Sequence, residues 1–395
     1  MNMLSEDGDS RKLPYSRKKK LQLKSGSERS GEYEPSLITE NDPDEEQFIS
    51  DPSFVSYVNQ TDIEDNPLHS TTHQFKCLKD TKELWRERKQ RAKNITETYC
   101  DGSVLGPHKD ITRTVPVVFV IEQKSKDPEE RVKLLVLTVN TAAHFNDRVY
   151  VLIFGPDMWN LRSLKPFRDN VRVYHYDDPS HPIYKAYLWF DSRIYVHVSS
   201  NAYSYEIVCF QRWFGLQKFV ELKKIPMAFV IDYDVLLFTN VTREMQLCYR
   251  GCTFGATRPT GTFTSYWSSD ALRDFVRFII TFYRGHMYMK KPQVSDMLVL
   301  NKFVGHFWAK NPEAQACFDE VANVTQWDPR PFPNRRTTFD NMIFRKGQES
   351  FYQDPIGLPF LFGVGGYNHY FPLKSLHFQG KQKKEILECV ASKNT

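Results

Sequence analysis

Short runs of β-branched and aromatic residues alternate with longer helical patterns from residue 115 onward, and this alternation limits the possible folds more than any other feature. The predicted strands lie at 115–121, 148–154, 171–176 and 227–231. A helix is predicted over 129–144, and a long amphipathic helix over 203–224 leads directly into the last of these strands. Strands that alternate with helices in this way are typical of βαβ units. The sequence therefore predicts an α/β domain with a mostly parallel central sheet flanked by helices.

Residues 1–112 have a different character, because they are polar and show little periodicity apart from a charged stretch near 84–93. They are predicted to form a disordered or stem-like lead, followed by a folded domain over 113–390. The basic run at 17–20 is compatible with a localisation or membrane-surface signal, but such a short run of charges is more often part of a solvated tail.

The overall composition limits the classes of partner. A chain of 395 residues is long enough to bury the core of one large domain or two modest ones. Its net charge of +5 is small and both signs are spread along the chain, which is not the pattern of a nucleic-acid-binding protein. The apolar runs are far shorter than the roughly 18–20 residues that a membrane span needs, so no transmembrane segment is predicted.

The cellular compartment is not determined by the sequence. The first residues lack the apolar core of a secretory signal, so the protein is expected either to be cytoplasmic or to have been separated from an anchoring segment. The seven cysteines include no CxxC pair and leave the redox environment open. N-x-T sequons begin at Asn59, Asn94, Asn240 and Asn323 and give slight weight to a Golgi or secretory lumen.

Two acidic residues stand at the end of a strongly apolar strand. In the string FVIDYDVLLF (229–238), Asp232 and Asp234 directly follow the buried run. Open α/β sheets bind ligands at the carboxyl ends of their strands, and residues two apart on a strand share a face. Two carboxylates suit Mg²⁺ or Mn²⁺, which prefers phosphate oxygens as further ligands. The alternative is that the two acids merely begin a loop, although so apolar a context favours a functional role.

A second motif lies near the carboxyl terminus, in the string SLHFQGKQKK (375–384). His377 can offer a neutral imidazole nitrogen to a metal, and Gly380 permits close approach of the backbone to a diphosphate. Lys383 supplies a point charge for phosphate groups. A partly buried histidine followed by a solvated basic tail would look the same in isolation, but the acidic pair upstream favours the functional interpretation.

Together these motifs resemble those of GT-A nucleotide-sugar transferases, in which a D-x-D motif follows a strand in the same order of elements. They are most similar to glycosyltransferase family 8, the glycogenin-like and bacterial galactosyltransferase-like group, which combines D-x-D with a C-terminal H-x-x-G-x-x-K. A third segment, SDMLVLNKF (295–303), is similar to the family's D-Q-x-x-L-N segment through Asp296, Leu300 and Asn301. Two features depart from the family pattern: Met297 replaces the glutamine, and no Pro-Trp follows the final lysine.

The resemblance implies a GT-A fold with a Rossmann-like sheet and a divalent cation, Mn²⁺ or Mg²⁺, bound by Asp234 and His377. Asp232 is implied to be a further metal ligand or a contact of the donor's ribose. Gly380 and Lys383 are implied to hold the diphosphate of a nucleotide-sugar donor.

Two more residues receive expected roles. Asp296 would lie in the donor-sugar pocket as a catalytic residue, although Asp296 or Ser295 could equally serve as a helix N-cap. Arg212, on the helix before the acidic strand, is expected either to reach the donor's diphosphate or to pack its stem on the helix surface.

The expected activity is transfer of a hexose or similar sugar from a nucleoside diphosphate donor, in the first place a UDP-sugar, to the hydroxyl of a glycan, protein or small-molecule acceptor. The family likeness implies retention at the anomeric carbon. One alternative is a haloacid-dehalogenase-like phosphatase, whose D-x-D also follows a strand. That motif normally opens its domain and has Thr or Val two residues after the second Asp, where this chain has Leu236. Another alternative is a non-catalytic nucleotide-sugar-binding protein.

Overall fold

A computed structural model describes residues 82–99, 114–123, 129–156, 159–161, 166–247, 253–257, 264–291, 293–310, 316–319, 352–353, 359–362, 370–372 and 374–378. All of them belong to one of the two compact units into which the chain divides, Val58–Thr395. The predicted lead therefore falls largely outside the described residues, as do Gly380 and Lys383.

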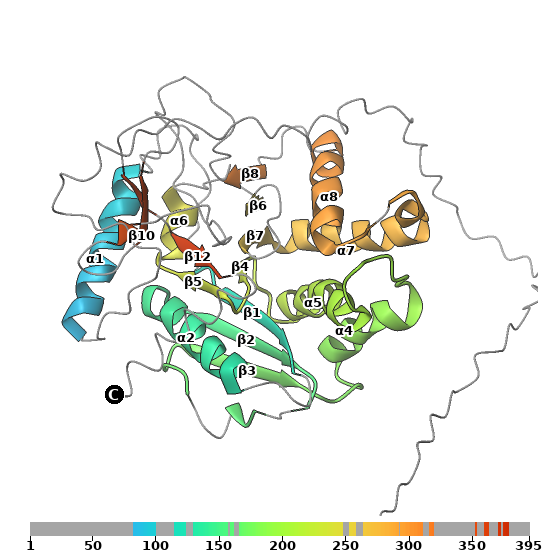
Figure 1. Cartoon of the computed structure of the whole chain (residues 1–395), viewed down its shortest axis with the longest axis horizontal. Helices are drawn as coiled ribbons and strands as arrows, with labels where there is room; N and C mark the ends of the chain where they lie inside the picture. Colours follow the sequence, from blue (N-terminus) through green and yellow to red (C-terminus); the bar gives the residue numbers. More distant parts are fainter. Residues whose placement is uncertain are drawn as a thin grey trace, which may run out of the picture. The chain divides into compact units, whose positions relative to one another are not determined.

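The centre of this unit is a seven-stranded sheet with the order β3-β2-β1-β4-β7-β6-β8. Its strands are β1 (Val117–Glu122), β2 (Val149–Phe154), β3 (Val171–Tyr176), β4 (Met227–Ile231), β6 (Phe254–Thr257), β7 (Thr264–Ser268) and β8 (Ala316–Asp319). Strands β3, β2, β1 and β4 run parallel to one another, and β6 runs parallel to β8. Strand β7 lies between these two groups and runs antiparallel to both β4 and β6. The prediction of an α/β domain with a mostly parallel sheet is confirmed (Figure 1).

Helices cover both faces of the sheet. They are α1 (Lys82–Tyr99), α2 (Glu129–Phe145), α4 (Pro182–Arg193), α5 (Tyr203–Leu222), α6 (Val241–Leu247), α7 (Ser269–Arg284) and α8 (Asp296–Lys310), with a 3₁₀ turn η3 (Met287–Lys290). Because neighbouring side chains of a strand face opposite ways, Val118 of β1 packs in a core with α4, α5, α7 and α8. Val117 and Phe119 instead pack in a second core with α2 and α6. Strands buried on both faces explain why the apolar runs of the sequence are continuous rather than alternating.

Helix α5 lies very close to β2, and a glycine makes this possible. A Cβ atom added to Gly215 would lie 2.5 Å from the ring of Phe154. Phe154 in turn stacks on Tyr187 of α4, with ring centroids 4.1 Å apart. This packing fixes the position of Arg212, which precedes Gly215 by about one turn of α5.

Helix α1 lies within the stretch that the sequence assigned to the lead. Its residue Trp85 packs on His144 of α2 with ring centroids 3.7 Å apart, and Ala92 is buried. A charged sequence can form such a helix because only one narrow side of it contacts the rest of the unit. Residues 82–99 are thus helical rather than disordered, and the boundary at 112 stays a proposal.

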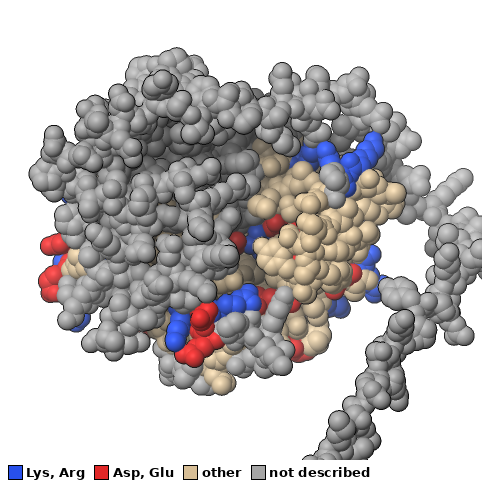
Figure 2. Space-filling model, viewed as in Figure 1, with Lys and Arg blue, Asp and Glu red and all other residues tan. Residues whose placement is uncertain are grey.

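The exposed side of α2 carries charged side chains. Lys133 and Glu129 form an exposed ion pair there, with Nζ and Oε1 2.7 Å apart. Figure 2 shows side chains of both signs over the region of α2, so this part of the described surface does not carry charges of a single sign. Among the described helices, none combines the length and the apolar composition needed to cross a membrane.

Two smaller sheets complete the described structure. One has three strands in the order β11-β10-β9, formed by β9 (Tyr352–Gln353), β10 (Pro359–Phe362) and β11 (Tyr370–Pro372). The other pairs β5 (Val235–Leu237) with β12 (Ser375–His377) in antiparallel orientation. This second sheet positions the candidate site, because β5 directly follows the acidic motif and β12 contains the histidine.

Candidate functional site

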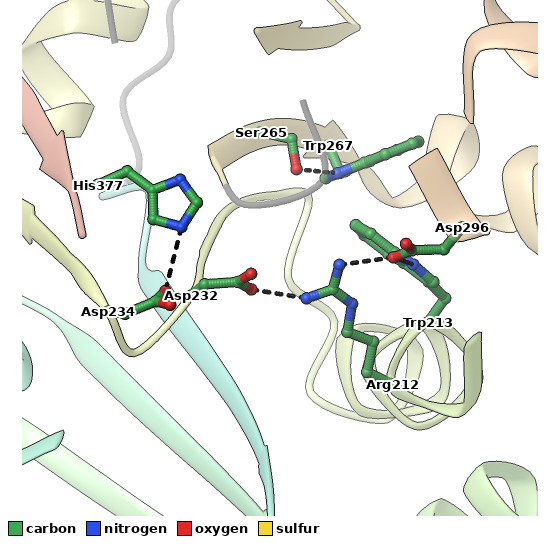
Figure 3. Close-up of polar contacts among 8 residues, drawn as sticks. All are labelled: Arg212, Trp213, Asp232, Asp234, Ser265, Trp267, Asp296 and His377. Atoms are coloured by element: carbon green, nitrogen blue, oxygen red, sulfur yellow. Dashed lines mark hydrogen bonds and ion pairs between the residues drawn. The ribbon is translucent and has the colours of Figure 1, made fainter. Parts of the chain in front are cut away.

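The acidic motif lies in a turn between β4 and β5, at the carboxyl end of a central strand. The backbone N–H of Val235 donates to the carbonyl of Asp232 at 3.2 Å and closes this turn. The expectation that Asp232 and Asp234 share the face of a strand is wrong, because β4 ends at Ile231 and strand alternation no longer applies. The two carboxylates instead meet different partners, as Figure 3 shows.

Asp234 meets His377 through the pairing of β5 with β12. His377 is the register partner of Val235, and the N–H of Phe378 donates to the carbonyl of Asp234 at 2.9 Å. The Nε2 atom of His377 lies 3.4 Å from Oδ1 of Asp234. Both side chains are nearly buried, with exposed fractions of 5% and 10%. Residues far apart in the sequence are thus brought together by two short strands.

Asp232 meets Arg212 of α5 instead. One guanidinium nitrogen of Arg212 donates to Oδ1 of Asp232 at 2.6 Å, and the other donates to Oδ2 of Asp296 at 2.6 Å. The indole N–H of Trp213 also donates to Oδ2 of Asp296, at 3.3 Å. We call Arg212, Asp232 and Asp296 the arginine cluster. It connects α5, the turn after β4 and the start of α8.

The electrostatics of the arginine cluster follow from its burial. Desolvation acts to lower the pKa of Arg212, but the adjacent carboxylates of Asp232 and Asp296 outweigh it and raise that pKa, so the guanidinium stays charged. Burial raises the pKa of Asp232, and the carboxylates of Asp234 and Asp296 add to the increase while Arg212 opposes it. The cluster therefore brings acidic groups together around one permanent cation.

The start of α8 resolves the two roles considered for Ser295 and Asp296. The backbone N–H of Leu298 donates to Oγ of Ser295 at 3.3 Å, so Ser295 acts as the cap. Asp296, only 3% exposed, directs its carboxylate to Arg212 and Trp213. The carboxylate of Asp296 therefore belongs to the candidate site, and Ser295 provides the cap of α8.

The expected trio of metal ligands is only partly assembled. Asp234 and His377 lie side by side, whereas the carboxylate of Asp232 is directed to Arg212. Within the described part of the chain, no three His, Cys, Asp or Glu side chains form a group arranged to hold a metal. One carboxylate and one imidazole still fit Mg²⁺ or Mn²⁺, which proteins usually bind through one or two side chains while phosphates and waters complete the shell.

The expectations for the basic residues have mixed outcomes. Arg212 was expected to reach a diphosphate or to pack its stem on the helix surface. It is instead 9% exposed and bound to two carboxylates. The sequence did not indicate this pairing, because Arg212, Asp232 and Asp296 are brought together only by tertiary packing. The predicted diphosphate contacts Gly380 and Lys383 lie outside the described residues.

No protein-family model matches the chain, and no curated protein matches its sequence. Among solved structures it is similar to mouse xyloside xylosyltransferase 1 in its apo form, with 11% identity, a TM-score of 0.39, and coverage of 68% of this chain and 97% of that one. It is also similar to the galactosyltransferase LgtC in complex with donor and acceptor sugar analogues, with 14% identity, a TM-score of 0.40, and coverage of 71% and 97%. For the glycosyltransferase GlyE of Streptococcus pneumoniae TIGR4 the values are 13% identity, a TM-score of 0.33, and coverage of 52% of this chain and 45% of that one. All three are glycosyltransferases, and at these identities and TM-scores the likeness is distant.

Proposed function

We propose that this chain is a metal-dependent GT-A glycosyltransferase that moves a sugar from a nucleoside diphosphate donor, in the first place a UDP-sugar, to an acceptor hydroxyl. The observation that carries the proposal is the contact between Asp234 and His377 at the carboxyl end of β4, 3.4 Å apart. A carboxylate and an imidazole placed together at this edge of an α/β sheet suit a cation that also binds phosphate oxygens.

In this proposal Asp234 and His377 hold Mn²⁺ or Mg²⁺. When bound, the cation supplies Lewis-acid stabilisation of the departing diphosphate. Lys383 adds a positive charge beside the same phosphates, and Gly380 allows the backbone to approach them. These two assignments rest on the sequence motif alone.

The arginine cluster has a positioning role in the proposal. Arg212 holds the carboxylates of Asp232 and Asp296 with short, charge-assisted hydrogen bonds. Fixed in this way, Asp232 serves as a ribose contact or a further metal ligand, and Asp296 orients hydroxyl groups of the donor sugar. Such groups stabilise charge effectively because they need no reorganisation during the reaction.

The decisive experiment measures release of free UDP. The protein is incubated with a panel of UDP-sugars, with Mn²⁺ or with a chelator, in the presence and absence of simple sugar acceptors. We expect release only with Mn²⁺ or Mg²⁺. Asp234→Asn should reduce it by more than the ~10–100-fold that loss of an outer partner of a metal ligand costs. Asp147→Asn, an exposed aspartate on the loop before β2, is the matched control and should leave it unchanged.

The same assay separates the alternatives. A haloacid-dehalogenase-like phosphatase would release inorganic phosphate from a simple phosphomonoester, and that release would depend on Asp232 as the nucleophile. A binding protein would show metal-dependent affinity for UDP without turnover. If no UDP-sugar is turned over, or if Asp234→Asn releases UDP as fast as the unaltered chain, the proposal is wrong.

A further inference from the structure

A buried ion pair anchors the strand that contains His377. Lys374 directly precedes β12, and its Nζ contacts Oε2 of Glu244 on α6. The side chains of Lys374 and Glu244 are 2% and 0% exposed. The hydroxyl of Thr239 donates to the other carboxylate oxygen of Glu244 at 2.7 Å. This polar group joins the start of β12 to helix α6.

The strand pairing alone specifies the position of His377 only weakly. The ladder between β5 and β12 has three residue pairs, and the two strands form a sheet of their own. A two-stranded ribbon of this kind is marginally stable by itself. The hydrogen bonds that extend it at either end run from Phe238 N–H to the Lys374 carbonyl at 2.8 Å and from Phe378 N–H to the Asp234 carbonyl at 2.9 Å.

Burial of apolar surface does not specify the register either. Leu376 and Phe378 are 1% and 0% exposed, and Ser375 and His377 on the other face are 0% and 4% exposed. Where one face of a sheet is in water, a slip by one residue is prevented by the exposure of apolar side chains. Here both faces of β12 are buried, and a slip would exchange Leu376 or Phe378 for His377 beside Asp234 without exposing either face.

The ion pair does distinguish the registers. In the observed register Lys374 meets Glu244, whereas a slip would move the ammonium of Lys374 away from this fully buried carboxylate. Separating the two partners of a buried ion pair is among the more costly changes in a protein. The ion pair of Lys374 is with Glu244 of α6 and involves neither Asp234 nor His377, so any effect it has on the site is indirect.

We propose that the Lys374–Glu244 pair sets the register of β12 on β5 and thereby places the imidazole of His377 against Asp234. Lys374 and Glu244 are then positioning residues for the metal site. The inference rests on the proposed function for its meaning, but the register itself can be measured independently of activity.

The test uses the full chain with three sets of changes. Lys374→Met removes one partner and is expected to lower the thermal midpoint. Lys374→Met combined with Glu244→Leu replaces both charges with apolar groups, a change that often restores stability. Lys374→Glu combined with Glu244→Lys reverses the pair and keeps its charge complementarity. Lys133→Met, which removes one partner of the exposed pair on α2, is the control.

Three properties are measured in each variant: the thermal midpoint, Mn²⁺ affinity in the presence of UDP, and hydrogen exchange of the Phe238 and Phe378 amides. For the apolar double variant we expect a thermal midpoint near that of the unaltered chain, Mn²⁺ affinity reduced ~10–100-fold, and faster exchange of both amides. The reversed pair should recover affinity and slow exchange, and the control should change neither.

A merely structural role gives a different pattern, in which affinity and amide protection return whenever stability returns. Unchanged affinity and unchanged exchange in a folded apolar double variant would overturn the proposal. If the unaltered chain itself binds no Mn²⁺ with UDP, the proposed function fails, and the exchange of the two amides alone then decides whether the pair sets the register.

Discussion

Two polar clusters lie beside the end of β4, and they differ in how completely their charges are compensated. In the arginine cluster, a guanidinium bonds two carboxylates at 2.6 Å each. In the other, the Nε2 atom of His377 and the Oδ1 atom of Asp234 are 3.4 Å apart, which exceeds an ordinary hydrogen bond. The first cluster contains its own cation. The second offers two kinds of metal-binding atom at one point.

This difference teaches that neighbouring acidic residues can have separate roles. Asp232 and Asp234 are two residues apart, yet one is bonded to a helix on one side and the other faces a carboxyl-terminal strand. We therefore expect changes in the arginine cluster to affect stability most, and changes in the Asp234–His377 pair to affect metal binding most.

The largest effect is expected for Arg212→Met, because it leaves the carboxylates of Asp232 and Asp296 together without their cation. Removal of one partner of a buried ion pair costs about 3–5 kcal/mol, and we expect the free energy of unfolding to fall by that amount in chemical denaturation. Arg277→Met is the control, since its exposed pair with Asp274 is 3.7 Å apart and contributes about 0–1 kcal/mol. Equal losses in both variants would show that Arg212 stabilises the fold no more than an exposed ion pair does, and would contradict the structural role of the arginine cluster.

The change His377→Gln is expected to weaken metal binding and to affect stability little, which is the reverse of what is expected for Arg212→Met. The amide keeps a polar group in place but is a poorer ligand than imidazole. The Mn²⁺ concentration that gives half-maximal UDP release should therefore rise by at least ~10-fold, the lower end of what perturbing a metal site costs. Thermal stability should change much less than in Arg212→Met. A large loss of stability with unchanged Mn²⁺ dependence would show that His377 serves the core and not a metal.

A smaller effect is expected for Asp296→Asn. Arg212 keeps its bond to Asp232, and the amide oxygen can still accept hydrogen bonds from Arg212 and Trp213. A hydrogen bond to a charged partner exceeds one to a neutral partner by about 1 kcal/mol, so unfolding should become easier by about that amount. The rate of UDP release should fall further than this loss of stability explains. If activity stays unchanged, Asp296 is a structural partner of Arg212 alone.

The smallest effect concerns a group away from both clusters, His144 at the end of α2. Burial lowers the pKa of His144 to about 4, and the nearby positive charge of Arg168 adds to this. The folded pKa lies below the ordinary value of 6.5, so the contribution of His144 is fully present above that pH and is lost as the pH falls toward 4. The thermal midpoint should decline over this window. The decline should be shallower in His144→Phe, and an unchanged slope would contradict the assignment.

Local patterns in the sequence predicted the elements whose residues are close together in the chain. The helix before β4 and the four parallel strands follow from apolar periodicity and lie within a few residues of their predicted bounds. The antiparallel strand β7 was not predicted, because the short segment TSYWS is not a continuous apolar run of the kind that marked the four predicted strands. Helix α1 was missed because its charged sequence contains few apolar residues.

The candidate site was predicted in its residue types but not in its arrangement. The motifs named Asp234 and His377, and the structure brings them together. The separation of Asp232 from Asp234 depends on where β4 ends, which the apolar run FVI does not reveal. The bond from Arg212 to Asp296 and the pair of Lys374 with Glu244 join residues distant in the chain, so no local pattern could indicate them.

The most direct test of the central claim is pulsed electron paramagnetic resonance of Mn²⁺ bound to the chain with UDP. A cation held by Asp234 and His377 should show modulation from a coordinated imidazole nitrogen. That modulation should disappear in His377→Gln and persist in His144→Phe, which removes a histidine outside the site. Absence of nitrogen coupling in the unaltered chain, or its survival in His377→Gln, would contradict the account.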